Sequence, residues 1–514
     1  MHQLRLAPLA LALSCPLGAV ACSSSGSGDG VGIDAGDAGD AGNGPREVTF
    51  PDRFLWGTAT AAFQVEKGDV HTDWSHWADT AGKIKNGDRP DVGGPDALAH
   101  VDEDIGLMTG EGHTAYRFSI EWARIYPTRA AFDADTPDAA AIAAYTTLLA
   151  KLRAASITPM VTLAHFALPD WLDDITAPAM PQGWERPEAS ALFVEFARRM
   201  AARFGKDVDW WITLNEPLNV VLAGYLQGSF PPGVVLDVPR AFTVVRAEAR
   251  VHAAAYDAIH AADTVDADGD GKAAWVSFAA HQRTYHPLDA ADADDVAAAE
   301  HVRYIANLWF LNAVTRGDWD EDLDGTYDGP NDRRADPTLA GRLDYVGLNY
   351  YSDTLISAHR GVVIPVINAA ILQDRLPTNR PKTDFFWDIY PEGFGTVLDE
   401  AKGYGLPILV TENGIADQAD VSRGRFLAEH LFQLGLAMKR GADVRGYFHW
   451  AMVDNFEWAS GFCPKFGLHT VDKATGQRTA RESARVYTGI IRAGKVRQED
   501  IDAMPPYGAP TPCN

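Results

Sequence analysis

Basic residues are scarce in this chain of 514 residues, which carries 45 Lys and Arg against 70 Asp and Glu. The formal net charge of -25 excludes nucleic acid as the expected partner, because phosphate recognition needs clustered basic side chains. It also disfavours electrostatic docking on an anionic membrane surface. The charge balance favours a neutral small-molecule partner such as a carbohydrate. The 14 Trp and 16 Tyr could stack against sugar rings, although the alternative for most of them is a place in the core.

Cysteine is scarce as well, with four residues in the chain. Cys15 and Cys22 lie near the N-terminus, whereas Cys463 and Cys513 lie in the body of the sequence. An exported chain permits a disulfide between the latter two, but the sequence does not give their distance, so pairing stays open. The spacing is not that of a metal site, and neither a catalytic metal nor a cofactor is expected.

No apolar run after the N-terminal region is long enough to cross a bilayer. Residues 1–21 contain one basic residue, Arg5, then an apolar run and several small residues, which is typical of a secretory signal peptide. Small residues before Cys22 and a polar tract after it resemble a bacterial lipoprotein signal, in which Cys22 becomes acylated. Ala19 stands where such signals usually have leucine, and free secretion is the alternative. We expect an exported protein, periplasmic or on the cell surface, linked to a membrane only by lipid at Cys22.

The composition divides the chain into four parts. After the signal peptide, residues 22–45 are rich in Ser, Gly, Asp and Ala, which predicts a flexible linker that cannot form a core. Residues 46–496 are expected to form a single catalytic domain. Residues 497–514 are expected to be a C-terminal tail.

Within the catalytic domain, short apolar runs rich in β-forming residues alternate with helical patterns. Several of the runs are apolar almost throughout, as expected for parallel strands that are buried on both faces. The eight runs are Phe54–Thr60, Thr114–Ile120, Thr158–Phe166, Trp210–Pro217, Ala273–His281, Asp344–Tyr351, Pro407–Asn413 and Val444–Ala451. Eight strands that are each followed by a helix predict an α/β fold of the TIM, or (β/α)8, barrel type. A doubly wound sheet, which usually has fewer strands, is the alternative.

Polar and aromatic residues gather at the ends of these runs, where barrel enzymes carry their chemistry. They are Gln64, Arg117, His165, Asn215, Glu216, Asn349, Tyr351, Glu412 and Trp450. Hydrolysis of a glycosidic bond needs two carboxyl groups in different protonation states, and Glu216 and Glu412 end two of the runs. The alternative for either glutamate alone is a salt bridge in a loop.

Seven segments give the chain a resemblance to glycoside hydrolase family 1, which includes β-glucosidases and β-galactosidases. In the family's order they are 54–66, 116–124, 165–171, 215–217, 349–352, 411–414 and 454–458. The resemblance extends from about Phe50 to Val486, almost the whole domain. It implies a retaining exo-β-glycosidase that removes terminal non-reducing β-D-glucosyl, galactosyl or fucosyl residues through a covalent glycosyl-enzyme.

The resemblance also implies roles for individual residues. Glu216 corresponds to the acid/base and Glu412 to the nucleophile, with Arg117 keeping Glu412 ionised and Tyr351 hydrogen-bonded to it. Asn349 belongs to the same catalytic group. Taken alone, Arg117 would be interpreted as a structural salt-bridge partner. The implied sugar-binding residues are Gln64, His165, Asn215, Trp387, Trp450, Glu457, Trp458 and Phe466.

Two positions bear on the substrate. Glu457 would repel a phosphate group, so the resemblance implies an unphosphorylated sugar. Leu218 stands where an aromatic residue is common in the family, which leaves the leaving-group preference open; Lys67 and Ala167 also depart from the family pattern. A transglycosylase that uses the same site, or a sugar-binding lipoprotein that has lost catalysis, are the alternatives in function.

Two acidic loops, 266–271 and 320–325, place Asp at alternate positions before Gly, as at the start of a calcium loop. Both lack a Glu at the twelfth position, where Ser277 and Asn331 stand. Solvated acidic loops are the alternative to calcium binding.

Overall fold

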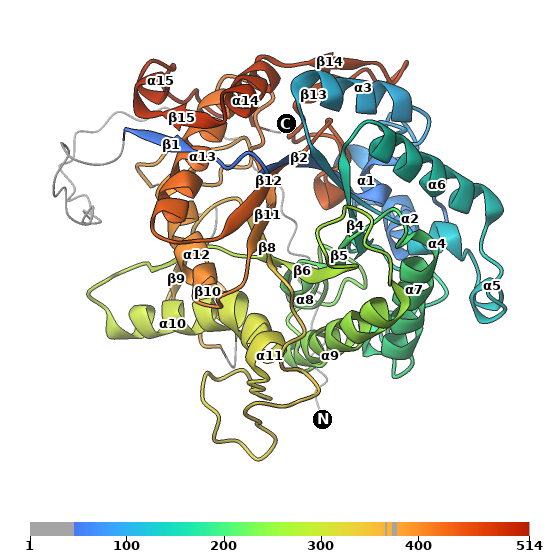
Figure 1. Ribbon diagram of the computed structural model, residues 1–514. Coiled ribbons are helices and arrows are strands. Elements are labelled where there is room, and N and C mark those ends of the chain that lie inside the picture. The colour runs from blue at the N-terminus through green and yellow to red at the C-terminus, as the bar shows by residue number, and fades with distance from the viewer. Residues whose placement is uncertain (1–45, 365–366, 373–377, 513–514) are drawn as a thin grey trace. The chain divides into compact units, whose positions relative to one another are not determined.

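The computed structural model describes residues 46–364, 367–372 and 378–512, and its centre is a closed barrel of parallel strands (Figure 1). The strands, in order around the barrel, are β2 (Leu55–Ala59), β3 (Ala115–Ser119), β4 (Thr158–Ala164), β5 (Trp210–Asn215), β6 (Trp275–His281), β8 (Val346–Tyr350), β11 (Ile408–Asn413) and β12 (Val444–Trp450). Each lies inside one of the eight apolar runs. The predicted TIM barrel is therefore confirmed, and the doubly wound alternative is wrong.

Side chains along the barrel strands alternate between the barrel interior and the surrounding helices. On β5, Trp210 and Ile212 pack in an interior cluster, whereas Trp211 between them packs in the large cluster that the helices complete. All six residues of β5 are buried, which explains why its sequence reads as a continuous apolar run. On β3, Arg117 lies two residues after the interior residue Ala115, so both side chains lie on the same face of the strand and the guanidinium points into the barrel.

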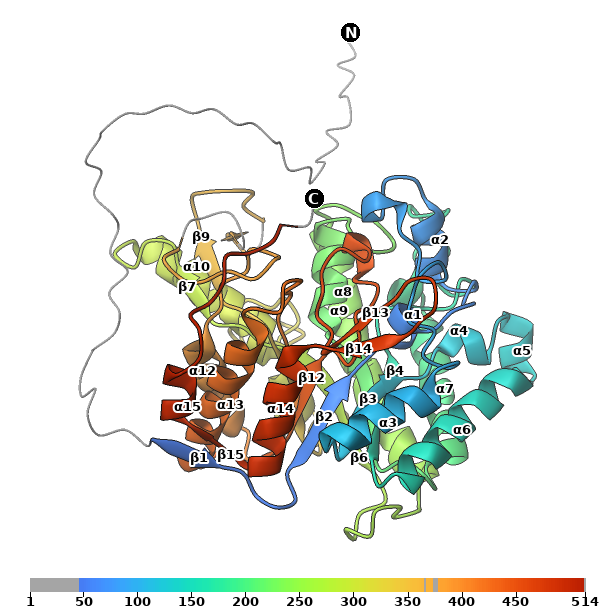
Figure 2. The ribbon, with the colours of Figure 1, turned by 90° about the horizontal axis from the view of Figure 1, so that it is seen from above.

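Helices lie outside the strands, as Figure 2 shows for α3, α6, α13 and α14. The longer helices are α3 (Val101–Glu111), α6 (Ala139–Ala154), α7 (Ala189–Phe204), α9 (Val238–Ala262), α10 (Ala293–Arg303), α12 (Pro391–Lys402), α13 (Arg423–Lys439) and α14 (Glu482–Ala493). In α7 the buried residues Leu192, Phe193, Phe196 and Met200 recur at helical spacing on the face that meets the barrel. The Asp138 side chain caps α6 by accepting a 2.8 Å hydrogen bond from the backbone nitrogen of Ala141.

Short strands outside the barrel were too brief for the sequence patterns to reveal. β1 (Glu47–Thr49) pairs antiparallel with β15 (Lys495–Arg497), so the start of the domain lies beside the segment expected to be a tail. That segment also contains a helix, α15 (Gln498–Asp502), and Tyr507 donates a 2.6 Å hydrogen bond to Glu429 on α13. The other short strands are β7 (Tyr285–Pro287), β9 (Thr354–Ser357), β10 (Ala370–Ile371), β13 (His469–Val471) and β14 (Arg478–Ala480).

Two statements from the sequence concern cysteines and membrane spans. Cys463 is disulfide-bonded, whereas Cys15, Cys22 and Cys513 lie outside the described residues, so whether its partner is Cys513 stays open. The signal peptide and the linker, 1–45, lie outside the described residues too. Among the residues that the structure describes, no helix combines the length and apolarity needed to cross a membrane.

Candidate active site

Two buried glutamates lie at the carboxyl ends of barrel strands. Glu216 directly follows β5 and precedes α8 (Pro217–Val221), and Glu412 is the penultimate residue of β11. The backbone of Glu216 has φ 46° and ψ 59°, a left-handed conformation that is uncommon for residues other than glycine. Such strain costs of the order of 1–3 kcal/mol and is concentrated at functional sites, where the surrounding structure enforces it.

Glu412 is held by two strong donors. Arg117 Nη1 donates a 2.6 Å hydrogen bond to Glu412 Oε1, and the Tyr351 hydroxyl donates one of 2.6 Å to Oε2. Burial raises the pKa of Glu412, but the positive charge of Arg117 and both hydrogen bonds favour the ionised carboxylate. The surroundings of Glu412 therefore favour the ionised carboxylate, which is the form that can act as a nucleophile.

Glu216 lies in the opposite environment. Asn349 Nδ2 donates a 2.7 Å hydrogen bond to its Oε1, and the Asn219 amide contacts its Oε2. Among the described residues no lysine or arginine lies within ion-pair distance of it. Burial and then the charge of Glu412 raise the pKa of Glu216 to about 8, so this carboxyl keeps its proton near neutral pH.

Two asparagines connect the glutamates. Asn215 Oδ1 accepts hydrogen bonds from Arg117 Nη2, at 2.7 Å, and from Asn349 Nδ2, at 3.2 Å. Asn349 Oδ1 in turn accepts a 2.6 Å hydrogen bond from the Thr411 hydroxyl. Asn215 Nδ2 lies 3.1 Å from His165 Nε2. This network links both carboxyl groups to residues on or directly after β3, β4, β5, β8 and β11.

A second polar group lies next to the glutamates. Gln64 Nε2 donates to Asn455 Oδ1 at 2.9 Å, and Trp450 Nε1 donates to Glu457 Oε1 at 3.1 Å. Gln64 Oε1 is buried without a hydrogen-bond partner among the described residues, as is Nδ1 of His165. Burial raises the pKa of Glu457 to about 8. These groups can bind the hydroxyls of a polyol.

The aromatic residues of the expected site surround these groups. His165 stacks between Trp450 and Trp458, with ring centroids 5.8 and 6.0 Å apart. Tyr351 meets Trp387 and Phe466 edge-on, each at 6.0 Å. Apart from Cys22, which lies outside the described residues, every residue expected at the site thus contacts at least one other member of the site.

Three residues of this site have no counterpart in the sequence-based expectations. His281 ends β6, the one barrel strand for which no functional residue was expected, and its Nδ1 lies 3.6 Å from Glu216 Oε2. Asn219 on α8 and Arg283 contact His281. The signal that could have found His281 is its place at the end of the fifth apolar run.

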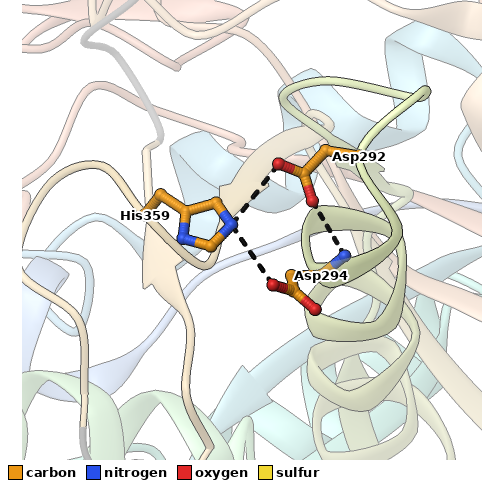
Figure 3. A group of neighbouring side chains, drawn as sticks. All are labelled: Asp292, Asp294 and His359. Carbon is orange, nitrogen blue, oxygen red and sulfur yellow. Dashed lines mark hydrogen bonds and ion pairs between the residues drawn. The ribbon is translucent and has the colours of Figure 1, made fainter.

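One group of side chains with metal-ligand chemistry lies at the start of α10. His359 Nε2 is 3.4 Å from an oxygen of Asp292 and 3.5 Å from an oxygen of Asp294, as Figure 3 shows. Asp292 also caps α10 by accepting a 2.9 Å hydrogen bond from the backbone nitrogen of Asp294. A helix cap with an exposed ion pair accounts for this arrangement.

The two acidic loops supply the other groups of this kind. Their members are Asp209, Asp266 and Asp268 in one group, and Asp320, Asp322 and Asp332 in the other. Asp266 accepts hydrogen bonds from the backbone nitrogens of Gly269, at 2.7 Å, and Gly271, at 2.9 Å. Asp209 immediately precedes β5, at the end of the barrel opposite Glu216. Whether these loops bind calcium or are solvated stays open, and neither possibility involves the glutamates.

A (β/α)8 barrel with two buried glutamates in unequal environments at its strand ends is the architecture of an O-glycosyl hydrolase. Residues 46–496 match the family described as glycosyl hydrolase family 1, and the chain belongs to that family.

Its relatives include chains that are named for different sugar substrates, galactosides and glucosides. It is 35% identical to a β-galactosidase of Pyrococcus woesei, covering 86% of this chain and 97% of the relative. It is 32% identical to β-glucosidase A of Thermotoga maritima, covering 86% and 98%. A solved structure of a Thermotoga maritima family 1 glycoside hydrolase, complexed with a cyclophellitol-analogue transition-state mimic, superposes with a TM-score of 0.78. That structure is 29% identical, and the match covers 88% of this chain and all of the other.

Proposed function

We propose that the protein is a retaining exo-β-glycosidase that removes terminal non-reducing β-D-glucosyl, galactosyl or fucosyl residues from unphosphorylated glycosides. One observation supports this most directly: two buried glutamates lie in unequal environments, because Arg117 and Tyr351 favour the ionised form of Glu412, whereas burial beside Glu412 favours the protonated form of Glu216. Retention of the anomeric configuration requires such a pair, with carboxyl groups about 5–5.5 Å apart.

In the first step the Glu412 carboxylate attacks the anomeric carbon. The bond from that carbon to the glycosidic oxygen breaks, and Glu216 gives its proton to the departing oxygen. The product is a glycosyl ester of Glu412 and a free alcohol. As the carboxylate loses its charge, Tyr351 and Arg117 continue to position the ester oxygens.

In the second step the deprotonated Glu216 takes a proton from a water molecule, and the resulting hydroxide attacks the anomeric carbon. The ester bond breaks, Glu412 recovers its negative charge, and Glu216 recovers its proton. Two inversions at the same carbon give net retention. Asn215, which is held by Arg117, lies where it can bind the sugar 2-hydroxyl and strengthen that contact in the transition state.

The polar group beside the glutamates supports recognition of a single terminal sugar. Gln64 and Glu457 share a 3.4 Å contact and can each take two hydroxyls, while the Trp450 face offers a platform for the ring. A phosphorylated sugar is disfavoured because the Glu412 carboxylate would repel its negative charge, and neither Gln64 nor Glu457 offers a cation to pair with it. The relatives include chains named β-galactosidase and β-glucosidase. These sugars differ in one axial or equatorial hydroxyl, and the orientation that Gln64 and Glu457 bind would decide between them.

We also propose that the enzyme is exported and carries lipid at Cys22. The small residues before Cys22 and the 22–45 linker support this proposal, because such a linker would hold a folded domain away from a membrane. Mass spectrometry of the membrane fraction tests it. A diacylglyceryl modification on Cys22 would be expected, and an unmodified N-terminus after another residue would contradict it.

The reaction itself is tested by following the first product anomer by NMR during cleavage of 4-nitrophenyl β-glucoside and β-galactoside. A β-anomer that appears first is expected, and the two rates rank the sugars. An α-anomer would contradict the assignment of Glu412 as a nucleophile. Binding of the sugar without release of 4-nitrophenol would identify a catalytically inactive binding protein, and acceleration by an added alcohol acceptor would identify a transglycosylase.

A further inference from the structure

His281 is a buried histidine that faces a hydrogen-bonding group at each ring nitrogen. Its Nδ1 lies 2.8 Å from Asn219 Nδ2, and its Nε2 lies 3.2 Å from Arg283 Nε. The same Asn219 nitrogen also contacts Glu216 Oε2. The three side chains therefore form a continuous chain of contacts that ends on the carboxyl group of Glu216.

This set of contacts contains one donor too many. Burial and the charge of Arg283 lower the pKa of His281 well below its usual value, so the ring is neutral. A neutral imidazole has one N–H donor and one acceptor nitrogen, yet both nitrogens face N–H groups. One of the two contacts must have the opposite polarity.

Arginine cannot reverse its polarity, whereas asparagine can. The Arg283 guanidinium has donors only, so Nε–H donates to His281 Nε2, and the ring proton must be on Nδ1. The two ends of an asparagine amide have nearly the same shape, and their assignment follows from their partners. A half-turn of the Asn219 amide places its oxygen against His281 Nδ1–H, which resolves the conflict.

The half-turn has a consequence for Glu216. Asn219 Oδ1 then faces Glu216 Oε2, and two oxygens at hydrogen-bond distance need a proton between them. That proton is on Glu216, because an amide oxygen carries none. Glu216 Oε1 is already an acceptor for Asn349 Nδ2 at 2.7 Å, so the only position left for the carboxyl proton is Oε2.

We propose that Arg283 is a positioning residue that sets the direction of this hydrogen-bond chain and so holds the proton of Glu216 on Oε2. The proton order is Arg283 Nε–H to His281 Nε2, His281 Nδ1–H to Asn219 Oδ1, and Glu216 Oε2–H to Asn219 Oδ1. The proposal rests on the assignment of Glu216 as the acid/base, and it goes further by identifying the oxygen that delivers the proton.

Other charges could affect the titration of Glu216. The titratable and charged groups facing Glu216 are Glu412 on β11, Arg117 on β3, His281 on β6 and Tyr351 after β8. Those facing His281 are Glu216, Arg283 and Tyr351. Arg283 has no carboxylate within ion-pair distance among the described residues. It stacks 5.4 Å from the centroid of Trp387 and donates a 3.3 Å hydrogen bond to Thr354, which fixes its guanidinium.

Removal of Arg283 shifts the pKa of Glu216 in opposite directions depending on whether Arg283 acts through the hydrogen-bond chain or only through its positive charge. Without Arg283, the neutral His281 can carry its proton on Nε2, and Asn219 can then turn its nitrogen towards His281 Nδ1 and the Glu216 carboxylate. The ionised form of Glu216 is then favoured, and its pKa falls. If Arg283 acted only as a distant positive charge, its loss would raise the pKa of Glu216.

The first experiment measures kcat/KM against pH for the wild type, Arg283→Met and Arg283→Lys. The chain predicts that the basic limb, which reports the pKa of Glu216, moves down by about one pH unit from its wild-type position in Arg283→Met. The activity loss would be about fivefold at the pH of the wild-type limb and small two pH units below it. Arg283→Lys keeps a side chain that only donates and should restore the wild-type limb. An unchanged or raised limb in Arg283→Met would overturn the proposal.

The second experiment needs no catalysis, so it separates this proposal from the proposed reaction. Nitrogen-15 NMR of the imidazoles in the full-length wild type, with His281 assigned by comparison with His281→Gln, reports which ring nitrogen carries the proton. A proton on Nδ1 is expected near pH 7. A proton on Nε2 would refute the chain even if the enzyme is a fully active retaining glycosidase.

Discussion

Arg117 Nη1 donates a 2.6 Å hydrogen bond to Glu412 Oε1 inside the barrel, where both side chains are almost completely buried. A buried ion pair of this kind is poor evidence for stability, because desolvation of the two charges offsets their attraction. Its consequence is chemical, since the guanidinium favours the carboxylate form of Glu412 over the protonated form. The pair should therefore affect how kcat/KM depends on pH.

Replacing Arg117 with methionine should move the acid limb of kcat/KM to higher pH. Loss of the cation leaves burial as the main influence on Glu412, whose pKa then rises by about 1–3 units. The carboxylate is needed for attack, so activity is lost as pH falls through the higher pKa. Arg117→Lys, which retains the charge but loses the contact with Asn215, serves as the control. An acid limb that stays in place in Arg117→Met would contradict this role.

Glu412→Gly should lower hydrolysis by several orders of magnitude, because it removes the carboxylate proposed to attack the anomeric carbon. Added azide should restore part of the turnover of an activated aryl β-glycoside, since the space left by the side chain admits a small anion on the same face. Its attack inverts the anomeric centre once, so NMR should show an α-glycosyl azide. A β-azide, or rescue in the wild type to the same extent, would point to another nucleophile.

Much of this site could be predicted from the sequence because the barrel strands are buried on both faces. Apolar runs such as Trp210–Pro217 located every barrel strand, and the parallel topology brings the strand ends together. Glu216 and Glu412 follow from those two facts and from the family motifs. The short β1–β15 pair was not predicted, because three-residue strands have no detectable period.

The surroundings of Glu216 were less predictable than its position. Asn219 and Arg283 are ordinary residues in sequence, and their contact with His281 depends on how α8 and the segment after β6 pack against each other. The strained backbone of Glu216, which turns its side chain toward these residues, also has no signal in the Asn-Glu-Pro sequence. Strand-end position alone could have identified His281.

Glu216→Gln should separate substrates by their leaving groups. Cleavage of an unactivated disaccharide needs protonation of the departing oxygen, and we expect a loss of about 10²–10⁴-fold, whereas a 2,4-dinitrophenyl glycoside leaves without a proton and should lose far less in the first step. Pre-steady-state kinetics should show a burst of dinitrophenol, because water attack on the glycosyl-enzyme also lacks its base. Equal losses for both substrates, with no burst, would exclude Glu216 as the acid/base.

Glu248 on α9 should make the stability of the protein depend on pH. Its carboxyl group is buried, its Oε2 has no hydrogen-bond partner among the described residues, and burial alone raises its pKa well above the usual value. The folded protein therefore keeps this proton at pH values where the unfolded chain has released it. The resulting stabilisation is complete at pH values below the pKa of Glu248 in the unfolded chain. It is lost as the pH rises from there towards the pKa of Glu248 in the folded protein, by about 1.4 kcal/mol per pH unit.

Glu248→Gln removes this titration while keeping the shape of the side chain. The thermal unfolding midpoint of the variant, relative to that of the wild type, should therefore rise as the pH rises from 5 to 8. The control Glu392→Gln, at an exposed position of α12, should show no such trend. Differential scanning calorimetry of the three proteins at several pH values measures the difference. If the midpoints of Glu248→Gln and wild type changed in parallel with pH, Glu248 would have to be ionised in the fold, and a partner for its charge would have to exist.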